Sequence, residues 1–101
     1  MELLNAPIEF EWDRHNIEHL RKHKVEHGEC EQVFFNIPLT VKLDFSHSCV
    51  EERYFTLGKT NMDRELVVIF TVRKTKIRVI TARDANKKER IRHETEENST
   101  I

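Results

Sequence analysis

The sequence has few cysteines and no long apolar segment. Cys30 and Cys49 are the only cysteines among 101 residues, too few for a disulfide scaffold, so a reduced compartment is expected. No apolar run approaches the ~20 residues of a membrane-spanning helix, and residues 1–11 lack the charge and apolar pattern of a signal peptide. Internal repeats and low-complexity segments are absent as well. These absences predict a soluble, cytoplasmic protein with no membrane partner.

The formal net charge of −1 conceals two parts of opposite charge. Residues 1–58 carry 6 Lys and Arg against 11 Asp and Glu, whereas residues 59–93 carry 11 against 4, and residues 94–101 add 3 glutamates. A basic C-terminal part predicts a localised site for a polyanion or an acidic partner. The alternative is ordinary solvated charge on strands and a helix.

The hydrophobic pattern predicts the order β-α-α-β-β-β-β-α. We expect strands at residues 8–12, 40–44, 52–57, 66–72 and 76–83, and helices at residues 14–23, 26–35 and from an Asp84 cap to about 93. Asp13 suits the N-cap of the first helix, and Pro38 prevents the second from continuing. Residues 94–101 are expected to form a frayed polar tail. This is an α+β fold of one domain, residues 1–101, with helices packed on one face of an antiparallel sheet.

Three arginines, Arg73, Arg78 and Arg83, mark the last two predicted strands. A tight turn at residues 74–75 would place Arg73 and Arg78 on one face of the sheet. Arg83 would lie at the far end of its strand, near Arg64 and the last helix. The planar guanidinium fork suits phosphate because it donates two parallel hydrogen bonds and stays charged. The alternative is exposed strand arginines that pair with glutamates such as Glu52 or Glu65.

A second group of polar residues, His47, Glu51, Glu52, Arg53 and Tyr54, precedes and begins the third predicted strand. A histidine and carboxylates near arginines could act as general acid and base when a ribose 2′-hydroxyl attacks its own phosphate. Glu51 and Glu52 point to opposite faces, so at most one is expected to be catalytic. The same residues could equally be polar groups of a loop and an edge strand.

Four histidines, His15, His19, His23 and His27, recur at intervals of four. They lack the glutamate and third ligand of a metalloprotease helix. Each step of four drifts ~40° around a helix, so they cannot converge on one ion, and neither a metal site nor another cofactor is expected. Lys22 and His23 could face the sheet site as a polar pair, or be cations favoured at a helix C-terminus.

The last predicted helix carries a basic face, made of Lys87, Lys88, Arg90 and Arg92, with Ile91 expected to turn toward the core. Such a face suits an RNA backbone or an acidic protein segment. A solvated helix surface is the alternative.

Short motifs over nearly the whole chain, in their order and spacing, resemble the BrnT family of bacterial type II toxins. They include Glu11-Trp-Asp13, Lys22-His23-Lys-Val25, Asn36-Ile-Pro38, Glu51-Glu-Arg-Tyr54, Phe70-Thr-Val-Arg73 and Ile77-Arg-Val-Ile-Thr-Ala-Arg83. The resemblance implies a RelE-like fold, metal-independent ribonuclease activity that arrests growth, and neutralisation by a ribbon-helix-helix antitoxin, through which alone the complex would bind operator DNA. The polar positions it carries over are Lys22, His23, His47, Glu51, Glu52, Arg53, Tyr54, Arg64, Arg73, Arg78 and Arg83.

The sequence departs from the family pattern where Lys24 replaces a glycine after Lys22 and His23. A glycine there would close the first helix in a left-handed conformation. We expect Lys24 to adopt that conformation at some cost, or the helix to end differently.

Two hypotheses follow. In the first, the protein is an endoribonuclease in which Arg73, Arg78 and Arg83 bind the scissile phosphate and Glu51, Glu52, His47 or His23 takes the 2′-hydroxyl proton. Further RNA contacts would come from Lys22, Arg53, Tyr54, Arg64, Lys87, Lys88 and Arg90. In the second hypothesis the protein is a non-catalytic module that binds an antitoxin or RNA.

Overall fold

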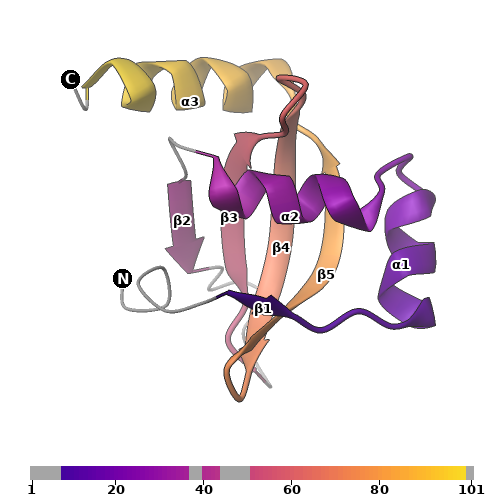
Figure 1. Cartoon of the computed structure of the whole chain (residues 1–101). Coiled ribbons are helices and arrows are strands. Elements are labelled where there is room, and N and C mark those ends of the chain that lie inside the picture. The colour runs from indigo at the N-terminus through magenta and orange to yellow at the C-terminus, as the bar shows by residue number, and fades with distance from the viewer. Residues whose placement is uncertain (1–7, 37–39, 44–50, 100–101) are drawn as a thin grey trace.

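The computed structural model describes residues 8–36, 40–43 and 51–99, which form a five-stranded sheet with three helices (Figure 1). The elements are β1 Glu9–Phe10, α1 Arg14–Arg21, α2 His27–Phe35, β2 Thr40–Leu43, β3 Tyr54–Lys59, β4 Glu65–Arg73, β5 Lys76–Asp84 and α3 Lys87–Ser99. The strand order is β1-β5-β4-β3-β2. All neighbours are antiparallel except β1, which runs parallel to β5. The predicted α+β class and element order are confirmed, and none of these helices is long and apolar enough to span a membrane.

Alternation along β4 defines two faces of the sheet. Leu66, Val68 and Phe70 are fully buried in the main core, where they join residues of α1 and α2 such as Leu20 and Val33. The odd-numbered residues of β4 point to the other face, where a smaller apolar cluster contains Leu57, Val67 and Ala85. One face is therefore sealed by α1 and α2, and the other is only partly covered.

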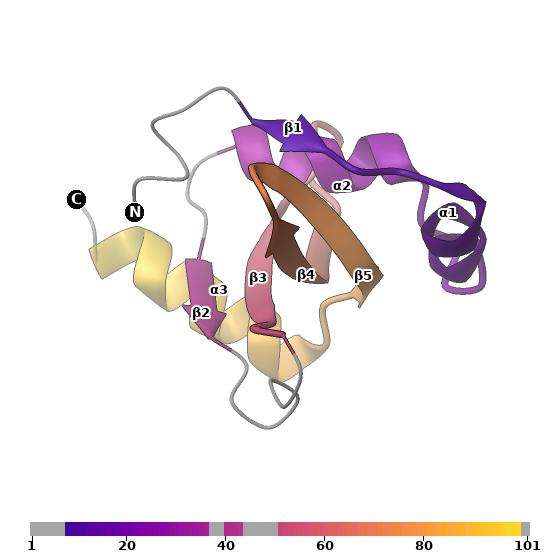
Figure 2. The ribbon, with the colours of Figure 1, turned by 90° about the horizontal axis from the view of Figure 1, so that it is seen from below.

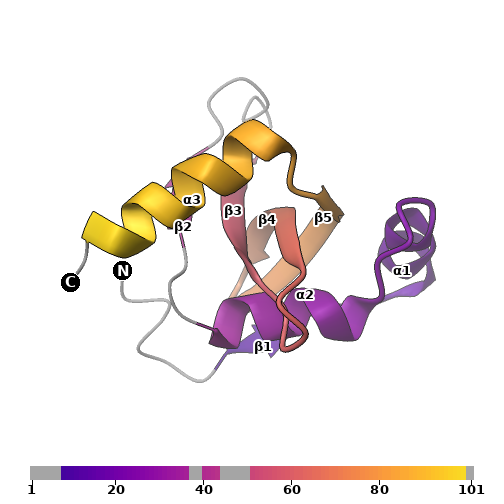
Figure 3. The same cartoon turned by 90° about the horizontal axis from the view of Figure 1, so that it is seen from above.

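The third helix lies on the opposite side of the sheet from α2, as the views from below and above show (Figures 2 and 3). The prediction that the helices pack on one face of the sheet therefore holds for α1 and α2, whereas α3 packs on the other face. The helix buries His93, whose Nδ1 lies 3.7 Å from Oε2 of Glu65. Ile91, expected to turn inward, is 54% exposed. Residues 89 and 93 face the sheet at helical spacing, which turns position 91 to solvent.

The start and end of α3 also differ from the prediction. Asn86 and Glu89 exchange hydrogen bonds between side chain and backbone, so Asn86 rather than Asp84 caps the helix. Asp84 is instead the last residue of β5. The helix continues to Ser99, six residues past its predicted end and into the expected frayed tail.

A β-bulge sets the direction of Arg83. The predicted tight turn at residues 74–75 is confirmed, because Arg73 pairs with Lys76 and Thr71 with Arg78. Further along, the register shifts by one residue, since Ile69 pairs with Thr81 while Phe70 pairs with Val79. Without this extra residue Arg83 would point to the main core. With it, Arg73, Arg78 and Arg83 share one face, which we call the arginine face.

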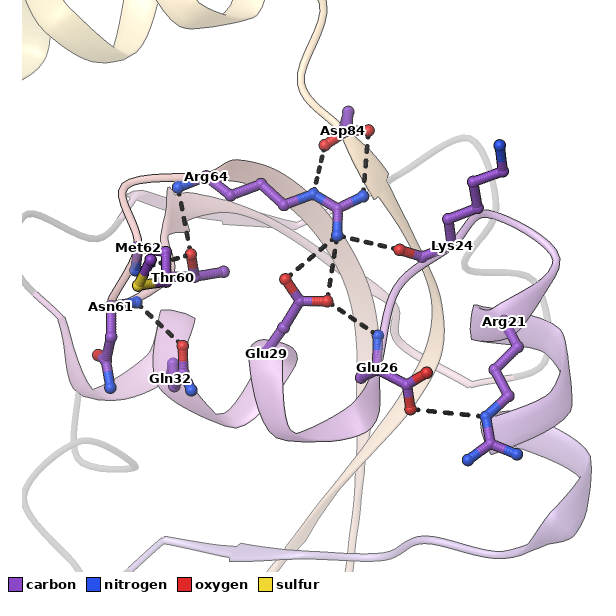
Figure 4. A network of polar contacts seen from close by, with 10 residues as sticks. All are labelled: Arg21, Lys24, Glu26, Glu29, Gln32, Thr60, Asn61, Met62, Arg64 and Asp84. Atoms are coloured by element: carbon purple, nitrogen blue, oxygen red, sulfur yellow. Dashed lines mark hydrogen bonds and ion pairs between the residues drawn. The ribbon is translucent and has the colours of Figure 1, made fainter.

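Arg64, just before β4, joins four segments of the chain (Figure 4). Its Nε and Nη2 donate to the carboxylate of Asp84 at 2.6 and 3.1 Å. Its Nη1 donates to both carboxylate oxygens of Glu29 at 3.1 Å and to the carbonyl of Lys24 at 3.0 Å. These bonds raise the pKa of Arg64, chiefly through Asp84, and the same bond lowers the pKa of Asp84. We therefore assign Arg64 a fold-holding role instead of the expected RNA contact.

Lys24 adopts the left-handed conformation expected from its place in the sequence, with φ of 59°. A side chain in this region costs on the order of 1 kcal/mol. The carbonyl that the turn exposes accepts the hydrogen bond from Arg64, and Glu29, the second partner of Arg64, also accepts from the backbone N–H of Glu26 at the start of α2. The Arg64 contacts thus offset the strain of the α1–α2 turn.

We expect Arg64→Lys to lower the free energy of unfolding by about 2 kcal/mol, because an ammonium group cannot bond Asp84, Glu29 and Lys24 in one fork. Urea unfolding followed by circular dichroism measures the change. The matched control is Arg14→Lys, at a surface pair with Glu18 on α1, which should shift stability by less than about 0.5 kcal/mol. Equal effects of the two substitutions would contradict this role of Arg64.

Candidate functional site

The strand arginines lie on one face but at opposite ends of it. Arg73 closes β4 at the hairpin, whereas Arg83 pairs with Val67 near the other end. Six residues of β4 separate the two positions, about 20 Å along an extended strand. The expectation that all three strand arginines hold one phosphate is therefore wrong, because the sheet keeps these two guanidinium groups apart.

At the hairpin end, Arg73 forms an ion pair with Glu51. Its Nη2 lies 3.2 Å from Oε1 and its Nε 3.4 Å from Oε2. The hydroxyl of Thr71 donates to the carbonyl of Glu52 at 2.7 Å, which fixes the segment before β3 to the arginine face and brings Glu51 to Arg73. Both side chains remain accessible, with 49% of Arg73 and 34% of Glu51 exposed. The hydrogen bond from Glu51 raises the pKa of Arg73, so the guanidinium stays charged.

Arg78 has a structural partner. Its Nη1 donates to Oδ2 of Asp13 at 2.8 Å, and only 12% of its side chain is exposed. Asp13 uses its other oxygen to cap α1, where Oδ1 accepts from the backbone N–H of Asn16. The bond to Arg78 is the main cause of the lowered pKa of Asp13. This pair ties the start of α1 to β5, so we assign Arg78 to the fold rather than to a substrate.

At the far end of the face, Arg83 forms a bidentate ion pair with Glu89 of α3. Nη1 and Nη2 donate to the two carboxylate oxygens at 2.8 and 3.0 Å. This bond is the main cause of the lowered pKa of Glu89 and of the raised pKa of Arg83. Arg83 is nevertheless 45% exposed. Its fork can therefore also meet a phosphate that approaches from solvent.

The candidates for acid–base chemistry are spread over the molecule. Glu51 is bonded to Arg73, whereas Glu52 accepts from the hydroxyl of Tyr54 at 2.9 Å. That bond is the main cause of the raised pKa of Tyr54, whose ring stacks on Phe70 on the main-core face. His23 lies beyond the end of α1, where its ring contacts His19. His47 falls outside the described residues.

The other expected RNA contacts are likewise spread over different parts of the molecule. Lys22 is exposed at the C-cap of α1, and the basic residues Lys87, Lys88 and Arg90 are exposed on the first turns of α3. Arg53 is half-buried in the segment before β3.

The sequence analysis also missed residues of the site. It overlooked the partners Asp13 and Glu89, although the spacing of Asn86 and Glu89 is that of a capping box. It also overlooked Phe55, which pairs with Ile69 on the arginine face.

The four histidines and Cys30 all lie among the described residues. Residues 8–36, 40–43 and 51–99 contain no group of three or more His, Cys, Asp or Glu placed to hold a metal ion. His15 and His19 lie on α1, His23 lies beyond the end of that helix, and His27 of α2 packs on the ring of Trp12. Burial raises the pKa of the Cys30 thiol to about 12, so it stays protonated at neutral pH.

The Arg83–Glu89 pair should make stability depend on acid pH. The pKa of Glu89 is below its ordinary value of 4.5 in the folded protein, so the pair stabilises the fold above that pH, and its contribution disappears as pH falls through the lower folded pKa. We expect Glu89→Gln, which keeps a capping side chain, to cost about 1 kcal/mol at pH 7 and clearly less near pH 3. Urea unfolding at both pH values, with Glu18→Gln as the exposed-pair control, measures this. A pH-independent cost would mean that the charge of Glu89 is not the cause.

Comparison with known protein families identifies a match over most of the chain. Residues 12–89 match the family described as "Ribonuclease toxin, BrnT, of type II toxin-antitoxin system", and this stretch holds α1, α2, β2 to β5 and the start of α3. A search of curated proteins returns no match. The family implies an RNA target and an antitoxin partner. Because the match covers well over half of the chain and agrees with the motifs of the sequence, the protein belongs to the BrnT family of ribonuclease toxins.

Proposed function

We propose that the protein is an endoribonuclease toxin that cuts RNA without a metal ion and that Glu51 and Arg73 form its catalytic pair. The observation that carries this proposal is the exposed ion pair between them. Of the expected proton acceptors among the described residues, Glu51 alone bonds a strand arginine, while Glu52 holds Tyr54 and His23 lies beyond α1. A carboxylate next to a guanidinium supplies both a base and a phosphate ligand.

The pair suits attack by a ribose 2′-hydroxyl on its own 3′-phosphate. Glu51 takes the hydroxyl proton as the new bond to phosphorus forms, and Arg73 donates to a non-bridging oxygen as charge builds there. The bond from phosphorus to the 5′-oxygen breaks, and that oxygen receives a proton from solvent. The products are a 2′,3′-cyclic phosphate and a 5′-hydroxyl end.

Arg73 can serve a phosphate without leaving Glu51. A guanidinium has five N–H donors, and the Glu51 carboxylate is bonded through Nε and Nη2. The Nη1 group and the second hydrogen of Nη2 point away from that carboxylate and remain for phosphate oxygens. The ion pair therefore orients both groups before RNA arrives.

We expect Glu51→Gln and Arg73→Lys each to lower kcat at least about 100-fold, because the first removes the base and the second the fork. The assay uses a single-stranded RNA in EDTA, with detection of the cyclic phosphate. Glu52→Gln, the neighbouring carboxylate, is the matched control and should stay within a few-fold of the wild type. Equal losses at Glu51 and Glu52, or activity that EDTA abolishes, would refute the proposed mechanism.

A non-catalytic binding module is the second candidate, and the carboxylate partners of all three strand arginines favour it. Internal ion pairs can hold a fold without any chemistry. The same assay separates the two functions, because a module would bind RNA or an antitoxin and leave the RNA intact.

As a toxin the protein would arrest growth and be neutralised by a ribbon-helix-helix antitoxin, and it would reach operator DNA only through that antitoxin. The exposed basic face of α3, with Lys87, Lys88, Arg90 and Arg92, supports docking of an acidic antitoxin segment.

Induced expression tests these roles. The wild type should stop growth and Glu51→Gln should not, and co-expression of a cognate antitoxin should restore growth. We expect Arg92→Glu, at a position of the basic face outside the expected RNA contacts, to remain toxic yet be neutralised less well by the antitoxin, because charge reversal repels an acidic segment. Full neutralisation of this variant would argue against the basic face as the docking site.

A further inference from the structure

Phe55 occupies an unusual position for an aromatic side chain in this protein. It lies on β3 opposite Ile69 of β4 and Lys42 of β2, and Ile69 pairs in turn with Thr81 of β5. Directly paired residues share a face, so these four side chains form a row across the arginine face. The other aromatic rings of the described residues pack in or around the main core.

The row lies between two covered parts of the face. On one side, Leu57 and Val67 are buried with Ala85, which leads into α3. On the other side, Thr71 is buried under the segment that carries Glu52. Phe55 packs against the edge of the small cluster and stays half-buried. Part of the ring therefore faces solvent on the side where the strand arginines lie.

Cations stand on both sides of the ring. Lys42 is exposed and directly opposite Phe55 on the neighbouring strand. Arg83 is two strands away and two residues along, about 12 Å from Phe55 between backbone positions. An exposed ring with cations at this range is complementary to a base that carries phosphates on both sides.

The same chemistry argues against a protein as the occupant of this row. The core of a stable interface buries about 800 Å² on each partner and is depleted in charge. Here the accessible apolar surface comes from Phe55 and Ile69, both half-buried and bordered by Lys42 and Arg83. A single base needs only one such ring.

We propose that Phe55 stacks on a base of single-stranded RNA while Lys42 and Arg83 hold the flanking backbone. This inference rests on the proposed ribonuclease function and adds to it a substrate class, a single strand whose bases are accessible. The contact lies away from the Glu51–Arg73 pair, so Phe55 acts in binding and not in the chemical step. Stacking on a ring accepts any base, so this contact favours single strands over duplexes.

The test measures binding of a fluorescent single-stranded RNA by anisotropy, in the Glu51→Gln background so that the RNA stays intact. We expect Phe55→Leu, which keeps apolar packing against Ile69, to weaken binding on the order of 10-fold. Phe55→Trp should bind like the parent, and its added fluorescence should be quenched by RNA, while Trp12, near α2, supplies the background signal. Phe35→Leu, at an exposed ring outside this face, is the matched control and should change nothing.

In the cleaving protein, Phe55→Leu should raise KM with kcat nearly unchanged, and thermal unfolding shows that the variant is folded. Unchanged RNA affinity in Phe55→Leu would overturn the proposal, as would weakened antitoxin binding with normal RNA binding, which would make the row a protein-docking surface. Phe55-dependent RNA binding by a wild type that cuts no RNA would support this inference and defeat the proposed function.

Discussion

The fork of Arg64 is the interaction on which the arrangement of the arginine face depends. It bonds Asp84, the last residue of β5, and at the same time Glu29 of α2 and the carbonyl of Lys24 in the turn after α1. Arg83 precedes Asp84 directly, and Ala85 follows with a backbone bond to Glu65. By bonding Asp84, Arg64 therefore holds in place the end of β5 that carries Arg83 and the point from which α3 starts.

The strand arginines are all bonded to carboxylates, and the exposure of each arginine separates their roles. The side chain of Arg78 is only 12% exposed and bonds Asp13, the N-cap of α1, as suits a contact that holds this helix. Arg73 and Arg83 are about half exposed. In these two pairs the carboxylate holds the guanidinium in place at little cost of desolvation. An incoming phosphate then meets an oriented fork instead of a freely rotating side chain.

Sequence reasoning succeeded where a local rule decides the outcome. The two-residue turn at residues 74–75 dictated that Thr71 faces Arg78, and the structure has this register. The substitution of Lys24 for the family's glycine pointed to a left-handed residue, which is present.

Sequence reasoning failed where the structure depends on contacts between residues that are distant in the sequence. The bulge near Ile80 cannot be recognised in the sequence, because an apolar residue fits either face of a strand. Ile91 looked like a core residue, but the bonds of Glu89 to Arg83 and Asn86 set the rotation of α3 and leave it exposed. The parallel pairing of β1 depends on where the chain enters the sheet. The Glu51–Arg73 pair required the Thr71 bond to Glu52, which joins residues 19 apart.

The layout of the face limits the substrate more than any single residue does. A cation and a carboxylate stand at the hairpin end, a cation stands near α3 about 20 Å away, and the ring of Phe55 lies between the two ends in the sheet. A mononucleotide can occupy one of these positions at a time. A strand of several nucleotides can meet all of them; in the proposed mechanism its cleaved bond would lie at Glu51 while the rest of the strand would bind along the sheet. If RNA binds as proposed, a face whose two exposed arginines are too far apart for one phosphate would gain binding energy from an RNA chain that reaches both.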